Sequence, residues 1–312
     1  MRTRARTAWR RSLLGWMVLV VLGGPAATAV PAATLRWKLK PGETLHYVME
    51  QQTETSDKAG AQESKVTLSQ TINWGWAVKE VGPDGVADLN LTIDRIRTTI
   101  ASPIGVFTYD SDDKQEPQGL LAAGLVPFLK ALVGAPFAVK MSPQGELSDV
   151  KVPEKLLQAI REAGPAGGGG ANIFSEEGLR HMITEVSLAL PKEDLEKGKS
   201  WTRQIKIPSP FGDMTLETVY TDQGPDPSAG PDVERINLET KVEVPPPPEG
   251  AAFKINAQER KGTFFFDNAA GRLIKSQVAE NMEAVLTINK IEISRRNTAT
   301  TTLKLESDGA SK

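Results

Sequence analysis

Hydrophobic and polar positions alternate along most of the chain after residue 34, a pattern typical of β-strands with one buried face. Between residues 66 and 78, apolar side chains occupy one parity and mostly polar side chains the other. Turn residues follow at 81–85, and a second alternating segment that starts at Leu89 slips in phase at Arg95-Ile96. We interpret the two segments as a β-hairpin whose second strand contains a bulge.

The C-terminal third repeats this pattern over a longer distance. Apolar residues keep one parity from Ile274 to Ile288, and the phase flips at Asn289-Lys290 before Ile291 and Ile293. We interpret this segment as one long strand, because a phase slip marks a bulge or bend. Such strands favour a strongly curved antiparallel sheet over a flat sandwich. Shorter strands are predicted at 35–39, 45–53, 136–141, 147–151, 201–207, 213–221, 233–244, 253–266 and 299–305.

Three segments instead show helical spacing of their apolar residues. The first, 119–133, carries a single charge, Lys130, whereas the second starts at Pro153 and the third follows Ser175, a good N-cap residue. A helix that is apolar nearly all round must be buried, enter a membrane or face an apolar cavity. The segment 119–133 is therefore either a plain core helix or the wall of a ligand cavity.

Two pairs of segments suggest an internal duplication. Residues 39–45 resemble 195–201, and residues 137–147 resemble 264–273, with Gly145 and Gly271 at equivalent turn positions. The chain then consists either of two related halves that share one sheet, or of hairpins that are alike because all hairpins need similar turns.

The first 29 residues have the pattern of a secretory signal peptide. Five arginines precede the apolar run Ser12 to Gly24, which is shorter than the ~20 residues that a membrane-spanning helix needs. Ala27-Thr28-Ala29 fits the cleavage pattern, and a second site extends the range to residue 33. We expect an exported protein, periplasmic or extracellular and not transmembrane after cleavage; an uncleaved membrane anchor is the alternative. The remainder is expected to form a single β-rich domain at 34–306, with a flexible Gly-rich connector at 164–172 and a disordered tail at 307–312.

Composition excludes several kinds of chemistry. The chain has no cysteine, so disulfides, thiolate metal sites and thiol nucleophiles are impossible. Without the leader arginines, 32 basic residues face 39 acidic ones, a charge of about −7 that argues against a nucleic-acid partner. His46 and His181 lack companion residues at metal-binding or general-base spacing, and the acidic loop 110–116 lacks the spacing of a calcium loop.

No metal, cofactor or catalytic residue is therefore predicted. Familiar nucleophile, phosphate-binding and dinucleotide motifs do not occur either. The simplest interpretation is a protein without catalytic activity; a hydrolase with an unrecognised site is a weaker alternative.

Five segments of the chain carry a resemblance to known proteins: LRWKLKPGETLHYVMEQQT (35–53), VGPDGVADLNLTIDRI (81–96), FLKALVGAPFAVKMSPQGELSDVKVPEKLL (128–157), FSEEGLRHMI (174–183) and LEKGKSWT (195–202). With them the chain resembles a family of secreted bacterial proteins known only as a domain of unknown function. The resemblance extends over most of the mature chain, and because the family has no assigned reaction it implies no functional residues. The strand-and-helix order is also similar to that of half-barrel periplasmic lipoprotein carriers, a likeness of architecture that does not establish function.

Taken together, the sequence predicts an α+β, β-dominant fold: a long-stranded, curved antiparallel sheet, half-barrel-like, with about three helices on its concave side. The predicted function is a non-catalytic envelope protein that binds an apolar ligand, a lipid or a lipoprotein acyl chain, between sheet and helices. The alternative is a structural or protein-interaction protein of the envelope with a filled core. The predicted cavity wall consists of Leu121, Leu125, Phe128, Leu129 and Leu132 on the helix and Trp74 and Trp76 on the facing sheet.

Overall fold

A computed structural model describes residues 34–163, 175–184, 186–194, 198–209, 212–247, 251–288 and 290–306, and all of them belong to one compact unit, Ala32–Lys312. The predicted signal peptide, the Gly-rich connector 164–172 and the tail 307–312 lie outside the described residues, as does the side chain of His181.

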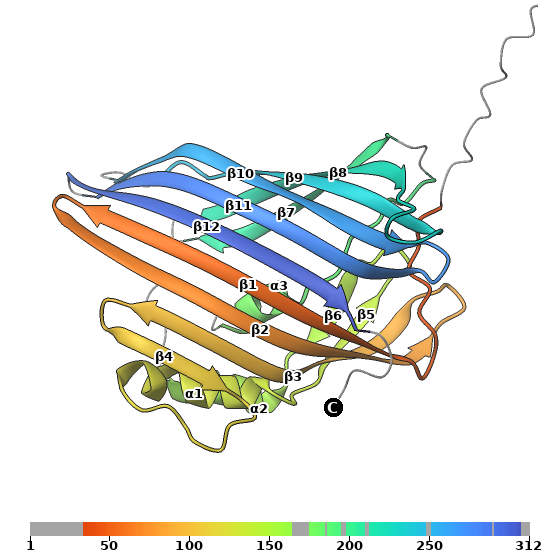
Figure 1. Cartoon of the computed structure of the whole chain (residues 1–312), viewed down its shortest axis with the longest axis horizontal. Coiled ribbons are helices and arrows are strands. Elements are labelled where there is room, and N and C mark those ends of the chain that lie inside the picture. The colour runs from red at the N-terminus through yellow and green to blue at the C-terminus, as the bar shows by residue number, and fades with distance from the viewer. Residues whose placement is uncertain are drawn as a thin grey trace, which may run out of the picture. The chain divides into compact units, whose positions relative to one another are not determined.

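The unit is built on a single antiparallel sheet of twelve strands (Figure 1). Its strand order is β6-β5-β3-β2-β1-β12-β11-β10-β9-β8-β7, with β4 paired to the outer part of β3. The strands are β1 (Thr44–Ala59), β2 (Gln62–Val81), β3 (Ala87–Ser102), β4 (Gly105–Asp110), β5 (Phe137–Met141), β6 (Leu147–Lys151), β7 (Ser200–Ser209), β8 (Gly212–Pro225), β9 (Val233–Glu243), β10 (Ala251–Asp267), β11 (Arg272–Ile288) and β12 (Ile291–Leu305).

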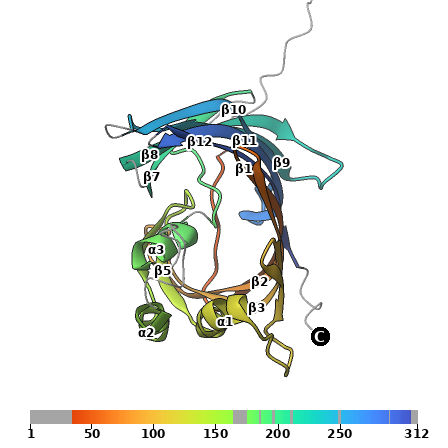
Figure 2. The same cartoon turned by 90° about the vertical axis from the view of Figure 1, so that its left-hand side faces the viewer.

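The sheet is open and curved, as predicted, and three helices of the described residues lie on its concave side (Figure 2). These are α1 (Leu120–Leu132), α2 (Glu154–Ala163) and α3 (Glu176–Thr184). Ser175 caps α3 as expected, because its Oγ accepts a hydrogen bond from the backbone N–H of Gly178 at 3.0 Å. None of the described helices has the length and apolar character that crossing a bilayer requires.

The core fills one end of the concave face. Trp76 of β2 stacks on Trp37 and lies against Tyr47 of β1, with ring centroids 5.9 and 4.9 Å apart. The buried hydroxyl of Tyr47 donates a hydrogen bond to the carbonyl oxygen of Leu273 at 2.9 Å. This end of the sheet carries the β2–β3, β5–β6 and β10–β11 turns, and we call it the filled end; the opposite end, with the β1–β2, β3–β4 and β11–β12 turns, is the open end.

The predicted strand at 35–39 is wrong. Residues 34–43 form an extended N-terminal strap that does not join the sheet. The backbone N–H of Trp37 donates to the carbonyl of Pro143, and that of Lys38 to the carbonyl of Gly271, at 2.8 and 2.9 Å. These partners lie in two hairpin turns rather than along one strand. The segment therefore has the alternating sequence of a strand, but its backbone does not pair with the sheet.

The two predicted phase slips have different causes. Next to Arg95 the register between β2 and β3 shifts, with Asp94 left out of the pairing, which confirms the bulge. At the second slip, by contrast, the chain reverses: Ile291 pairs with Ile288, and Lys290 has a φ of 68°, whereas Asn289 lies outside the described residues. The interpretation of one long strand through this point is therefore wrong, because a tight hairpin turn shifts the side-chain phase just as a bulge does.

The segments 39–45 and 195–201, which suggest a duplication, begin hairpins with similar backbone hydrogen bonds. The N–H of Gly42 donates to Val78 at 2.9 Å, and the N–H of the equivalent Gly198 donates to Asp222 at 2.8 Å. In the sheet order, five strands of the first half (β1, β2, β3, β5 and β6) and five of the second (β7 to β11) flank β12. These bonds continue the antiparallel pairing of β1 with β2 and of β7 with β8, which ordinary hairpins also form, so the two related halves stay a prediction.

Candidate functional site

The structure brings all of the predicted cavity residues together, but in the hydrophobic core. Trp74 and Trp76 are buried, and so are Phe128 and Leu132 of α1. The remaining three helix positions are half-buried and pack against that core: Leu121, Leu125 and Leu129. All seven predicted residues are thus part of one core cluster or pack against it.

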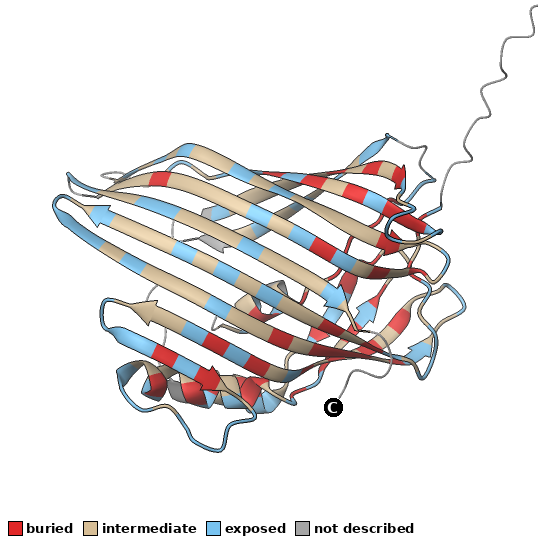
Figure 3. Cartoon of the chain, in the orientation of Figure 1, coloured by how far each residue is buried: buried red, intermediate tan, exposed pale blue. Residues whose placement is uncertain are grey.

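The same concave face continues beyond the core towards the open end. On β1, Tyr47 is buried, whereas Gln51, Thr53 and Thr55, which share its parity, are partly exposed. In Figure 3, most of the buried residues gather accordingly near the filled end of the strands. Because side chains of one parity point to one face, the uncovered positions line the concave side of the sheet.

Apolar side chains are concentrated on this uncovered surface. All are half-buried, and among the described side chains they neither belong to the hydrophobic core nor pack against it. Cross-strand pairing sets them side by side, as in the row Phe253, Leu286 and Ile293 across β10, β11 and β12. We call this surface the open half; its apolar residues are Val66, Leu68, Ile205, Ile207, Met214, Leu216, Phe253, Ile255, Met282, Leu286 and Ile293.

A belt of hydrogen-bonded polar side chains separates the core from much of this apolar surface. The Nη1 of Arg260 donates to Thr240 Oγ1 at 3.0 Å, and the hydroxyls of Thr240 and Thr218 are 2.9 Å apart. On the other side, Nε of Arg260 lies 3.6 Å from Oε2 of Glu280. The belt continues through Asn297, Thr55, Gln51 and Gln70.

Strands β9 and β10 separate next to this belt. Their pairing runs from Val233 and Asp267 to Glu239 and Lys261, and beyond that point β9 continues with β8 and β10 with β11. The Oε1 of Gln258 accepts the backbone N–H of Val242 at 2.9 Å, so a side chain bridges the diverging strands. Arg260 therefore lies at a fork in the sheet.

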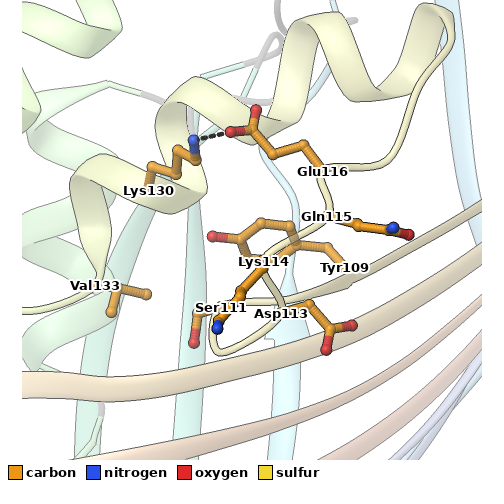
Figure 4. A pocket seen from close by; sticks show the side chains of 8 residues that line it. All are labelled: Tyr109, Ser111, Asp113, Lys114, Gln115, Glu116, Lys130 and Val133. Carbon is orange, nitrogen blue, oxygen red and sulfur yellow. Dashed lines mark hydrogen bonds and ion pairs between the residues drawn. The ribbon is translucent and has the colours of Figure 1, made fainter.

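A pocket of about 270 Å³ lies between the acidic loop 110–116 and α1 (Figure 4). Lys130 of α1 forms an ion pair with Glu116, and Arg95 forms ion pairs with Asp110 and Asp112 at 2.6 and 2.9 Å. Hydrogen bonds from Arg95 hold the pKa of the Asp110 carboxyl below its usual range. Asp110, Asp112 and Glu116 of this loop thus pair with cations of the protein itself, and the described residues contain no cluster able to hold a metal ion.

Sequence reasoning missed one pair of titratable groups. Nδ1 of His46 lies 3.8 Å from Oδ2 of Asp94, on the convex face of the sheet. Gly75 of the intervening β2 makes room for them, because a Cβ there would lie 2.9 Å from the same carboxylate oxygen. Burial raises the pKa of Asp94, and the nearby histidine partly offsets this rise. A glycine within a strand was the available signal for such a close approach.

A second pocket, of about 490 Å³, lies over β3, β5 and β6 near α3. It contains four basic residues, but Lys140 is paired with Asp88 at 2.7 Å and Arg180 with Glu176 at 2.6 Å. The other two, Lys79 and Lys151, are exposed surface residues. This basic surface is shallow and is separate from the open half.

Comparison with known proteins gives a match to one family model over part of the chain, and no activity. Residues 84–224 match the model of a family described as "Family of unknown function (DUF6263)", which confirms the resemblance to a domain of unknown function. No curated protein matches the sequence.

Similar solved structures are distant. A structure titled "Lipid-protein interactions in lipovitellin" is 12% identical with a TM-score of 0.48; the match covers 88% of this chain but 26% of the lipovitellin chain. Pseudomonas aeruginosa OccK5 (OpdH) is 8% identical with a TM-score of 0.27, over 87% and 100% of the two chains. An outer membrane channel of Pseudomonas putida is 10% identical with a TM-score of 0.25, over 86% and 97%. At these scores the likenesses carry no argument about function.

Proposed function

We propose that the protein is a non-catalytic, exported envelope protein that binds an apolar ligand, an acyl chain of a lipid or lipoprotein, on the open half of its concave face. The observation that supports this proposal is the row of half-buried apolar side chains on a face that the core and the helices leave uncovered. The convex face of the same strands carries Lys254, Lys261 and Arg296. The concave face there carries mainly apolar side chains, next to the ion pair of Asp57 with Arg295.

The physical argument is the cost of leaving such a surface in water. Covering apolar surface gains roughly 25 cal/mol per Å², and contiguous apolar surface that is not covered by the protein itself commonly marks a binding site. An acyl chain laid along the strands covers Leu216 on one side of the fork and Phe253 and Leu286 on the other. A flexible chain of methylene groups suits this surface, because it needs no polar partners.

Two neighbouring residues of β11 allow a matched test. Leu286 points into the open half, whereas Val285 points to the convex face, where its Cα pairs with those of Lys254 and Ser294. We expect Leu286→Ser to weaken binding of a fluorescent fatty-acyl probe by about tenfold, since a buried leucine contributes roughly 1.5 kcal/mol or more. Val285→Ser should leave the affinity unchanged. Equal effects of the two substitutions would contradict the proposed site.

The ligand itself is accessible to analysis. Organic extraction of natively purified protein, followed by mass spectrometry, should recover a lipid in amounts comparable to the protein. If no lipid is found and the folded protein does not bind the probe, the binding proposal fails. The alternative, an interaction protein of the envelope, would then be favoured, and β7, whose outer edge has no partner strand in the described sheet, offers a surface for strand addition.

A further inference from the structure

The most exposed large apolar side chains of the described residues gather at the open end. Four of them are between 62% and 82% exposed: Ile104, Val106, Leu120 and Ile291. Ile104 and Val106 belong to the β3–β4 hairpin, and Ile291 follows the β11–β12 turn. Leu120 is the first residue of α1, which begins on the same side (Figure 1). Among the described residues, no large apolar side chain at the filled end is exposed to this degree.

Short turns hold these side chains at the tips of the hairpins. Ser102 pairs with Gly105, so residues 103–104 form a two-residue turn, and the Ser102 hydroxyl donates to the carbonyl oxygen of Gly105 at 3.1 Å. Ile291 pairs with Ile288 across an equally short turn. Such turns have little conformational freedom left to lose on binding, so they present their side chains to a partner at low entropic cost.

The separation of the tips indicates the kind of partner. In the sheet order, β2 and β1 lie between the β3–β4 hairpin and the β11–β12 hairpin, so the exposed apolar side chains do not form one contiguous patch. A stable protein interface buries about 800 Å² on each side around a packed apolar core. A bilayer needs no such patch, because its fluid interfacial region closes around each inserted side chain separately.

The charges at the same tips also fit a phospholipid surface. Lys58 and Glu63 are Cα partners beside the β1–β2 turn, and Lys290 and Glu292 lie at the β11–β12 turn; all four are exposed. Two positive and two negative charges give these turns no net charge. A zwitterionic head group offers a phosphate to each lysine and an ammonium group to each glutamate, whereas a strongly acidic or basic partner is repelled by half of them.

The apolar surface of the open half continues to one of the tips. Ile291 shares the parity of Ile293, its neighbour along β12, so both lie on the concave side. We propose that the open end docks on a phospholipid bilayer and inserts its four exposed apolar side chains among the head groups. An acyl chain then passes between the bilayer and the open half without crossing water. This inference goes beyond the proposed acyl binding, because docking requires only the open end.

The absence of cysteine permits a site-specific test. Ala61→Cys in the β1–β2 turn and Ala229→Cys in the β8–β9 turn replace exposed alanines at the open and the filled end, and each carries one environment-sensitive dye. With phosphatidylcholine vesicles added to the full chain, the dye at residue 61 should shift to shorter wavelength and be quenched by nitroxide groups on the lipid chains. The dye at residue 229 should do neither. Because the readout is local, attachment of another segment to the vesicles does not mimic it.

A double variant, Ile104→Ser with Ile291→Ser, measures the contribution of the apolar tips in the chain labelled at residue 61. The vesicle concentration at half-maximal shift should rise at least about tenfold, the value of burying one large apolar side chain. Both residues are exposed, so the variant should keep the native circular dichroism. Leu286→Ser is the matched control: it should weaken acyl-probe binding but leave the vesicle midpoint unchanged, so docking and acyl binding stand or fall separately.

Several outcomes would overturn docking through the open end. These are no shift at residue 61, an equal shift at residue 229, an unchanged midpoint in the double variant, or loss of the response when salt is raised from about 0.1 to about 0.5 M, which would assign the contact to charge. A shift that grows with protein concentration without vesicles would assign the tips to a second copy of the chain. A shift that stays with the protein after the vesicles are removed would report a bound lipid instead of docking.

Discussion

At the scale of single residues, Gly145 shows how closely the filled end is packed. Its φ is +81°, and a Cβ at this position would lie 2.2 Å from the carbonyl oxygen of Leu188 and 2.5 Å from Nε1 of Trp37. These two groups are hydrogen-bonded to each other at 3.0 Å, so neither is free to move aside. We expect Gly145→Ala to lower the free energy of unfolding by about 3 kcal/mol or more, as measured by urea denaturation.

Gly42 provides the control for this substitution. Its φ is +82°, almost the same as at Gly145, but a Cβ there would meet nothing within 4 Å. Gly42→Ala should therefore cost about 1–2 kcal/mol, the penalty of the left-handed conformation alone. If the two alanine variants unfold at the same urea concentration, crowding at Gly145 has no energetic weight and the packing argument fails.

The sequence predicts such residues well where the requirement is local. Gly145 and Gly271 were expected at equivalent turns, and both have positive φ values, 81° and 64°. The alternation that placed Trp74 and Trp76 on one face is also confirmed, because both are buried. Gly75 shows the opposite case: it makes room for Asp94 beside His46, two residues that approach across three strands, and single-sequence periodicity contains no such information.

At the scale of elements, Arg95 ties β3 to the end of β4 and to the loop before α1. Its Nε and Nη2 donate to the two carboxylate oxygens of Asp110 at 3.0 and 2.6 Å. These hydrogen bonds lower the pKa of Asp110 relative to the unfolded chain, so the pair stabilises the fold above the ordinary aspartate pKa. The stabilisation is lost as the pH falls through the lowered value, where the folded protein also binds the proton.

The expected result is a pH-dependent difference between the native protein and Asp110→Asn. The variant should have the lower melting temperature at pH 7, and the gap should close as the pH is lowered below about 4. Glu193→Gln, at an exposed position before β7, serves as the control and should show no gap at either pH. A gap for Asp110→Asn that stays constant over this range would mean that Arg95 does not stabilise the charged carboxylate.

Element boundaries followed from the sequence only where a turn or cap has its own chemistry. Ser175 marks the start of α3 correctly. The turn between Ile288 and Ile291 resembles a bulge in the sequence, because both shift the side-chain phase. The prediction of a strand at 35–39 is wrong for another reason. Its residues alternate like those of a strand, but their backbone partners lie in two turns more than 100 residues away in the sequence. Whether an extended segment joins a sheet depends on such distant partners.

At the scale of the whole described unit, the curved sheet and its helices could be predicted, but the position of the candidate site along the strands could not. Trp76 and Leu68 have the same parity on β2, yet one belongs to the core and the other to the open half. The difference arises from the strap and from the buried segment around Leu188 to Leu190, which cover the filled end. Periodicity assigns each residue to a face of the sheet. Which part of that face is buried depends on segments that are remote in the sequence.

This uneven cover should produce two levels of local stability within the same strands. Amides near Tyr47 and Trp76 lie over the core, so their hydrogen exchange should require nearly global unfolding, whereas amides at 51–57 and 64–70 should exchange faster through smaller openings. A bound acyl ligand at about ten times its Kd should slow exchange in the second group roughly tenfold and leave the first unchanged. Mass spectrometry of exchanged peptides measures both groups in one experiment, and each strand contains its own reference segment. Uniform exchange along β1 and β2, or ligand protection confined to the core, would contradict a site on the open half, because a ligand stabilises most strongly the openings that destroy its own binding surface.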